Sequence, residues 1–286
     1  MHLTPQQVSD FDRDGCAFPF RVLSTEQAAH YRHCLEQHEA IAGKPLQGNW
    51  RHKTHLLFTW ADRLVHHPKI LDAVENLIGP DILCWGTSLR AKAADGKTFA
   101  GWHQDTAYAE VKPIVVIVAL ALSPSRAENG CIRAIPGSHR GPLLPHKEAF
   151  KTDSLLSREQ YIDSDFDRSA AVDLALESGE IALFNNAIVH GSNPNFGADR
   201  RILFLIEMVP TRAWQQAPRE SAALVRGSDA YGNFDVDPPP RREMGAAELA
   251  AWQRAVEIQA SVLFRGAQRP PRALAGMTSG KPPGGS

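Results

Sequence analysis

The sequence predicts a mainly β protein with flanking helices, in which the strands form an antiparallel sandwich or barrel of the jelly-roll type. Three observations support this class. Between about residues 82 and 210 the chain is a succession of short apolar runs separated by Gly, Asn, Asp and Pro. No helical pattern separates these runs, as it would in a doubly wound parallel sheet. Helical patterns instead precede and follow this region.

Three helices are expected before the strands. The first begins after Thr4, with Pro5 in its first turn and Gln7 completing a capping box. The motif STEQ at 24–27 repeats this arrangement and predicts the second helix. The third lies in HPKILDAVENLIGP at 67–80, where apolar residues recur at helical spacing and a Gly-Pro pair ends the helix.

The apolar runs that predict strands are DILCWGTSLRAKA, PIVVIVALAL, CIRAIPG, AVDLALESGEIALFNNAIVH and RRILFLIEMVP. After them, ELAAWQRAVEIQASVLF predicts one C-terminal helix. The segment 268–286 is dominated by Gly, Pro and Ser and lacks periodic apolar residues, so we expect a disordered tail. Because no repeat or linker interrupts the rest, residues 1–267 are expected to form a single domain.

Composition excludes several classes of function. The 31 basic and 32 acidic side chains nearly cancel, which gives no support for a nucleic acid or an anionic membrane as partner. The 4 cysteines are far apart in the sequence and are expected to be reduced thiols. No secretory signal is evident, and no apolar run reaches the roughly 18 residues of a membrane span. We therefore expect a cytoplasmic protein without an obligate protein partner.

The segment GWHQDTAY at 101–108 carries a first pair of potential metal ligands. If it is a strand, His103 and Asp105 project to the same side and can bind one ion, because side chains alternate along a strand. A chain with 12 His residues also contains such a pair by chance. The pair alone is therefore weak evidence.

A third potential ligand, His190, ends an apolar run and is followed by a polar loop and two arginines. A hairpin here would place an arginine close to His190. Two His and one carboxylate on one side of an octahedral ion leave three positions open, as in non-haem iron(II) oxygenases. The arginine could then hold the far carboxylate of an organic co-substrate. Strand register leaves Arg200 and Arg201 both open for this role.

Together these segments resemble the phytanoyl-CoA dioxygenase-like (PhyH) branch of the iron(II)/2-oxoglutarate oxygenases. The likeness includes the early helices, GWHQDTAY, ENGCIRAIPGSHRG at 128–141, and HGSNPN followed by Arg. It implies a double-stranded β-helix core, cupin-like, at about 82–210. It also implies that His103, Asp105 and His190 are the iron ligands and catalytic residues, and that Arg201 anchors the distal carboxylate of 2-oxoglutarate.

Further co-substrate contacts are suggested on both sides of the metal motif. Ser192 resembles the hydroxyl partner that the family provides for the same carboxylate, although a turn residue explains it equally well. Lys92 and Arg90 share one face of the preceding strand and could reach the co-substrate, unless they are simply solvated. Arg200 is the alternative to Arg201.

The substrate contacts predicted from the sequence are Trp102, Tyr108 and His55. Trp102 and Tyr108 flank the metal motif and could line a pocket, although such aromatic residues are as often part of the packing. His55 lies in WRHKTHLLFTW at 50–60, which resembles the substrate-facing lid of the family. His139 is expected to satisfy a loop backbone.

The resemblance implies an oxidoreductase that uses iron(II) as cofactor and 2-oxoglutarate and dioxygen as co-substrates, with ascorbate as a supporting reductant. The expected reaction is hydroxylation of an unactivated C–H bond of a small metabolite, with release of succinate and carbon dioxide. The carboxylate of Asp105 favours hydroxylation over halogenation. Two alternatives remain open: a metal-binding jelly-roll isomerase or hydrolase that does not use dioxygen, and a non-catalytic small-molecule-binding homologue.

Overall fold

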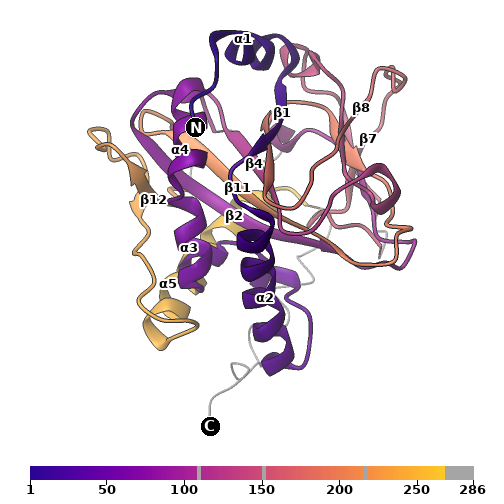
Figure 1. Ribbon diagram of the computed structural model, residues 1–286. Helices are drawn as coiled ribbons and strands as arrows, with labels where there is room; N and C mark the ends of the chain where they lie inside the picture. Colours follow the sequence, from indigo (N-terminus) through magenta and orange to yellow (C-terminus); the bar gives the residue numbers. More distant parts are fainter. Residues whose placement is uncertain (108–110, 150–152, 216–217, 268–286) are drawn as a thin grey trace.

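Two antiparallel sheets that pack face to face form the centre of the molecule (Figure 1). This architecture comes from a computed structural model, which describes residues 1–107, 111–149, 153–215 and 218–267. Two facing sheets of mainly antiparallel strands with flanking helices are the predicted jelly-roll class, so the predicted fold class is confirmed. Within the described ranges, no helix has both the length and the apolar character that crossing a membrane requires.

The larger sheet has the strand order β1-β9-β4-β11-β2-β12-β13, in which only β12 and β13 are parallel neighbours. The smaller sheet has the order β3-β10-β5-β8, and β6 pairs with β7 as a separate hairpin. The strands of the larger sheet are β1 (Cys16–Arg21), β2 (Ile82–Lys92), β4 (Val116–Ala121), β9 (Glu180–Asn185), β11 (Arg201–Pro210), β12 (Ser221–Arg226) and β13 (Asp235–Val236). The others are β3 (Ala100–His103), β5 (Ile132–Ala134), β6 (His146–Glu148), β7 (Gln160–Ile162), β8 (Val172–Leu174) and β10 (His190–Ser192).

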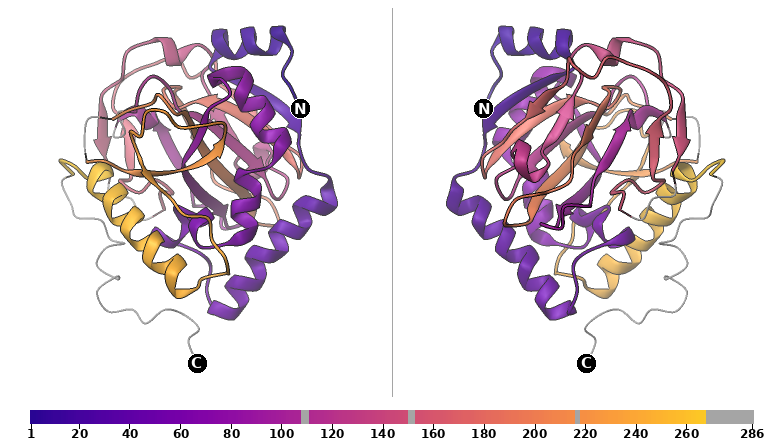
Figure 2. Two further views of the ribbon diagram at one scale, coloured as in Figure 1. Left: turned by 90° about the vertical axis from the view of Figure 1, so that its left-hand side faces the viewer. Right: turned by 90° about the vertical axis from the view of Figure 1, so that its right-hand side faces the viewer.

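Helices surround the sheets, and α2 and α5 extend along two sides of the same end of the molecule (Figure 2). They are α1 (Pro5–Asp14), α2 (Thr25–Ala42), α3 (Thr59–Val65), α4 (Pro68–Ile78) and α5 (Ala246–Leu263). The capping boxes predicted at Thr4 and Ser24 are both present. Gly79 ends α4 at a φ of 93°, a conformation that side chains with a Cβ rarely adopt.

Alternation along β11 divides the apolar residues into two cores. Phe204 and Ile206 face outward and pack with residues of α3 and α4, such as Leu64 and Val74. Leu203 faces inward, where it joins residues of both sheets. One strand therefore contributes one side to the helix-covered core and the other side to the space between the sheets, where the site lies.

The sheet extends beyond the predicted region at 82–210. β1 forms one edge of the larger sheet by pairing with β9, and β12 pairs with β2 near the other edge. Pro19 lies within β1, and a proline argues against a central strand because it cannot donate to the ladder, although an edge tolerates it. Local pattern therefore did not indicate β1, and long-range pairing forms it. Helix α3 was also not predicted.

Candidate active site

Three side chains from two distant segments converge between the two sheets. The Nε2 atom of His103 lies 3.2 Å from Oδ1 of Asp105, and Nε2 of His190 lies 3.8 Å from Oδ2 of Asp105. Potential ligand atoms of the three residues all lie within 4.8 Å of one another. Adjacent ligands of an ion bound at about 2.1 Å are separated by about 3 Å, so small side-chain movements suffice to bind one metal. The residues present therefore fit the implied iron.

The backbone orients both imidazoles for metal binding. His103 and His190 are opposite each other on β3 and β10. The Nδ1 atom of His103 lies 2.8 Å from the carbonyl oxygen of Gly101, and that of His190 lies 3.0 Å from the carbonyl oxygen of Ile188. A carbonyl only accepts hydrogen bonds, so Nδ1 carries the proton in each ring and the Nε2 lone pair is free for a metal.

Asp105 reaches this site in a different way from that predicted. The sequence interpretation placed His103 and Asp105 on one strand, but β3 ends at His103 and Asp105 begins a 3-10 helix, Asp105–Ala107. The Asp105 backbone N–H donates to the carbonyl oxygen of Asn186, which fixes the turn next to β9. The turn, rather than strand alternation, directs the carboxylate towards the two imidazoles.

Electrostatics keep His190 and Asp105 in the states that metal binding requires. Burial lowers the pKa of His190 to about 4, so its imidazole is neutral near pH 7. Burial opposes ionisation of Asp105, but nearby His190, His103 and Arg90 outweigh it and bring the pKa of Asp105 to about 2. A neutral imidazole and an ionised carboxylate are the forms that coordinate a metal.

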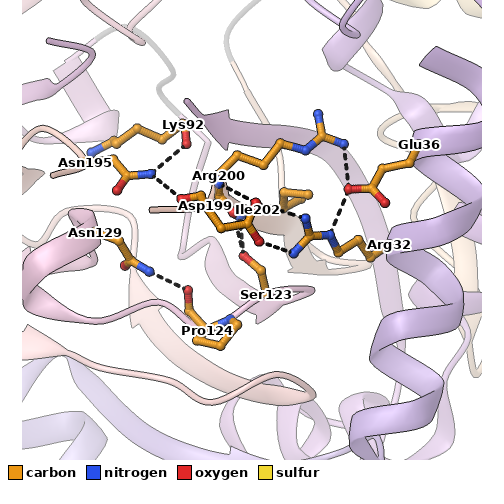
Figure 3. A network of polar contacts seen from close by, with 10 residues as sticks. All are labelled: Arg32, Glu36, Lys92, Ser123, Pro124, Asn129, Asn195, Asp199, Arg200 and Ile202. Carbon is orange, nitrogen blue, oxygen red and sulfur yellow. Dashed lines mark hydrogen bonds and ion pairs between the residues drawn. The ribbon is translucent and has the colours of Figure 1, made fainter. Parts of the chain in front are cut away.

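The two adjacent arginines point to opposite sides of the larger sheet. Arg201 is only 2% exposed and lines the cavity that also contains the three ligands. Its Nη1 donates to the carbonyl oxygen of Arg90, and its Nε is buried and has no hydrogen-bond partner among the described residues. Arg200 instead forms ion pairs with Glu36 and Glu39 of α2 (Figure 3 shows the Glu36 contact).

The predicted hairpin between His190 and these arginines is not present. β10 belongs to the smaller sheet and β11 to the larger one, so the loop between them crosses from one sheet to the other. Arg201 and His190 therefore approach the cavity from opposite walls.

Lys92 and Ser192 lie beside Arg201 at this end of the cavity. The Lys92 ammonium is fully buried and donates to Oγ of Ser192 at 2.8 Å and to the carbonyl oxygens of Gly130 and Asn193. These three acceptors use all three of its donors. Burial and the charge of Arg201 lower the pKa of Lys92, whereas the three acceptors favour the charged form, which has a donor for each of them. Lys92 thus orients Ser192, which lines the cavity.

The three predicted substrate residues are not brought together by the described part of the fold. Trp102 contacts Phe166 and Arg133 and is absent from the described cavity lining. His55 is buried, with its Nδ1 3.1 Å from Oγ1 of Thr87, and is likewise absent from that lining. Tyr108 lies outside the described residues.

Several residues that line the cavity were not selected from the sequence. They include His52, Trp85, Gln160, Glu207, Glu220 and Gln259. The sequence does indicate one of them. Glu207 interrupts the apolar run RILFLIEMVP six residues after Arg201, and an even spacing along a strand places both side chains on the same face. The others come from segments whose proximity depends on the whole fold.

A family model described as Phytanoyl-CoA dioxygenase (PhyH) matches residues 11–203, which include the three ligands and Arg201. Among curated proteins, the chain is 29% identical over 184 residues to a probable alpha-ketoglutarate-dependent hypophosphite dioxygenase of Stutzerimonas stutzeri. That match covers 63% of this chain and 60% of the relative, so it spans less than two thirds of the relative's length.

Solved structures are similar over a larger part of the chain. The apo form of the non-heme monooxygenase ThoJ is 32% identical with a TM-score of 0.80, and the match covers 92% of this chain and 99% of that one. CytC3 with Fe(II) and alpha-ketoglutarate is 22% identical with a TM-score of 0.65, covering 85% and 96%. The likeness to CytC3 concerns the fold alone.

Proposed function

Because this chain belongs to the phytanoyl-CoA dioxygenase (PhyH) family of iron(II)- and 2-oxoglutarate-dependent dioxygenases, we propose that it is an enzyme that hydroxylates an unactivated C–H bond of a small metabolite. Succinate and carbon dioxide are the co-products. The observation that carries this proposal is the convergence of His103, Asp105 and His190 within one cavity. Residues 1–267 act as one catalytic domain, which is supported by the contribution of both sheets and α5 to that cavity.

In this proposal, Nε2 of His103, Nε2 of His190 and the Asp105 carboxylate hold the iron on one side, which leaves positions for the co-substrates. When bound, iron(II) supplies the activation of dioxygen that couples oxidation of 2-oxoglutarate to oxidation of the substrate. The carbonyl groups of Gly101 and Ile188 keep both imidazoles in the correct tautomer. The chain therefore provides a rigid ligand set that needs little reorganisation.

We assign the distal carboxylate of 2-oxoglutarate to Arg201 and Ser192. The orphaned Nε of Arg201 supports this assignment, because a buried guanidinium donor without an acceptor is unfavourable and a carboxylate would satisfy it. Lys92 holds the Ser192 hydroxyl at the same end of the cavity. Other residues that line the cavity, such as Arg90 and His52, are left for the substrate.

The test is succinate formation by the purified chain, measured with and without iron(II), 2-oxoglutarate and dioxygen, in the presence of ascorbate. Succinate should form only when all three are present, and His190→Ala should abolish both iron binding by calorimetry and turnover. His33→Ala is the matched control, because His33 is exposed on α2. Near-normal turnover by His190→Ala would contradict the ligand set. Tight zinc binding without succinate under any condition would favour an isomerase or hydrolase.

A further inference from the structure

Two carboxylates line the cavity at a distance from the co-substrate residues. Glu207 projects from β11 on the same side as Arg201, six residues farther along the strand. At about 3.3 Å per residue, the two backbone positions are about 20 Å apart. Glu220 immediately precedes β12, which pairs with β2 beside β11. Both carboxylates therefore belong to the part of the cavity that the five-carbon co-substrate does not reach from Arg201.

Neither carboxylate has a cationic partner within the described part of the chain. The nearby Lys53 ammonium is already paired with Asp237 at 2.9 Å and also donates to the carbonyl oxygen of Ser221 at 2.6 Å. Both oxygens of Glu220 are buried and have no hydrogen-bond partner in the described ranges, and the residue is 1% exposed. An ionised carboxylate in this environment is unfavourable unless a ligand supplies the opposite charge.

Arg90 is the second cation near Glu207, and two of its N–H donors already bind other groups. Its Nε donates to Oγ of Ser88 at 3.1 Å, and its Nη1 donates to the carbonyl oxygen of Leu155 at 3.0 Å. Arg90 is close enough to lower the pKa of Glu207, but burial and the charge of Asp105 prevail and raise it to about 7. Arg90 therefore does not neutralise Glu207.

At Glu220, too, the effect of burial on the pKa outweighs that of the nearby positive charge. Burial is the largest effect and raises the pKa of Glu220, although Lys53, Gln215 and Trp85 act in the opposite direction. The side-chain N–H groups of Gln215 and Trp85 lie near the carboxylate without hydrogen-bond geometry to it. The two acids thus share a shortage of positive charge.

The backbone is shaped to make room for the Glu207 carboxylate. Glu207 pairs with Gly86, whereas its neighbour Met208 pairs with Cys84, so Trp85 is the extra residue of a β-bulge. A Cβ atom on Gly86 would lie 2.3 Å from Oε2 of Glu207. The absence of a Cβ at Gly86 therefore leaves the space in which the carboxylate lies across β2. The bulge also brings Trp85, whose ring lines the cavity, into the same region.

We propose that Glu207 and Glu220, together with Trp85, form a subsite for a positively charged nitrogen of the substrate, an ammonium or guanidinium group. Carboxylates with an aromatic ring are the groups that recognise organic cations. The proposal rests on the proposed function, since it names the substrate class of the same cavity. Glu207, Glu220 and the helix that carries Gln259 lie beyond the segment 11–203 that matches the family model.

The experiment compares probes of similar size that differ in charge. Binding of n-butylguanidine and n-butylurea, and of n-pentylamine and 1-pentanol, is measured by calorimetry without dioxygen, with iron(II) and 2-oxoglutarate present. The cationic member of each pair should bind about tenfold more tightly or better, which corresponds to about 1.4 kcal/mol. Glu207→Gln and Glu220→Gln should each reduce that preference. Glu257→Gln, which removes a charge from the exposed side of α5, should leave it unchanged.

The subsite is overturned if the two members of each pair bind equally or if no probe binds. It is also overturned if the preference for the cationic probe survives both substitutions. Thermal unfolding of Glu207→Gln and Glu220→Gln checks that each variant is folded, and the second carboxylate provides an independent test if one variant is not. Succinate formation by the wild type is measured separately. A charge preference without succinate would refute only the proposed function, and succinate without a charge preference would refute only the subsite.

Discussion

Arg200 and Arg201 are adjacent and chemically identical, yet their surroundings separate their roles. Arg200 is placed before the first residue of β11 and forms ion pairs with acidic residues of α2. Arg201 points into the cavity, and no residue that the structure describes accepts a hydrogen bond from its buried Nε. The alternation of side chains along a strand explains the division. From the sequence, either residue could have faced the site, because the register was not determined.

We expect Arg201→Ala to raise the Michaelis constant for 2-oxoglutarate about tenfold to a hundredfold. The reason is the loss of a charge-assisted contact worth about 1.5–3 kcal/mol. The Michaelis constant is measured from steady-state succinate formation over a range of 2-oxoglutarate concentrations. Arg200→Ala is the matched control and should leave this constant unchanged. If Arg200→Ala raises it and Arg201→Ala does not, the assignment is reversed.

Among the elements, the 3-10 helix Thr54–Leu56 is held against the distant strands by a buried ion pair. Lys53 precedes this helix at a positive φ of 49°, and its ammonium contacts Asp237 and the backbone of Ser221. The pair joins positions 184 residues apart. Nothing in the local pattern of WRHKTHLLFTW predicts this contact, since the partner follows β13. By resemblance the segment is expected to be a substrate-facing lid, whereas the structure packs His55 against Thr87 of β2.

Asp237→Ala should lower the free energy of unfolding by about 3–5 kcal/mol, because it leaves the buried Lys53 ammonium without its counter-charge. Urea unfolding at pH 7 measures this loss. The double variant Lys53→Met with Asp237→Leu should recover most of it, because no uncompensated charge remains. If Asp237→Ala is as stable as the wild type, the ion pair contributes nothing to the free energy of unfolding.

The same pair predicts a pH dependence of stability. Burial alone would raise the pKa of Asp237, but Lys53 and His55 outweigh it and hold the pKa far below the unfolded value of about 3.9. A depressed folded pKa contributes stability that is fully present above the unfolded value and is lost as the pH falls towards the folded one. Unfolding free energies between pH 6 and pH 3 should therefore decline less steeply for Asp237→Asn than for the wild type.

On the scale of the whole molecule, the two sheets form one site from opposite walls. The smaller sheet carries the two imidazoles, and the larger sheet carries Arg201 and Glu207. Binding of a metal and co-substrate between them should stabilise the folded state, because the unfolded chain cannot assemble the site. This stabilisation follows from mass action alone, because the ligands bind the folded state and not the unfolded one.

At a hundredfold excess over the dissociation constant, a ligand should stabilise the fold by about 2.7 kcal/mol. We expect iron(II) with 2-oxoglutarate, without dioxygen, to raise the melting temperature by several degrees, and removal of the metal by a chelator to reverse the rise. Differential scanning calorimetry measures the shift. His103→Ala should abolish it, and His33→Ala should retain it. An equal shift in both variants would place the metal elsewhere.

The sequence by itself determined the fold class, the early helices with their caps, and the identity of the three proposed ligands, because periodicity, capping motifs and the family resemblance are properties of local segments. Only the tertiary structure decided that Asp105 lies on a turn, that Arg201 rather than Arg200 faces the cavity, and that Glu207 and Glu220 both line the cavity without an ion pair to any described residue. These features depend on register, on a β-bulge and on contacts between segments far apart in the chain. Such contacts form only when the two sheets pack, so no local pattern records them.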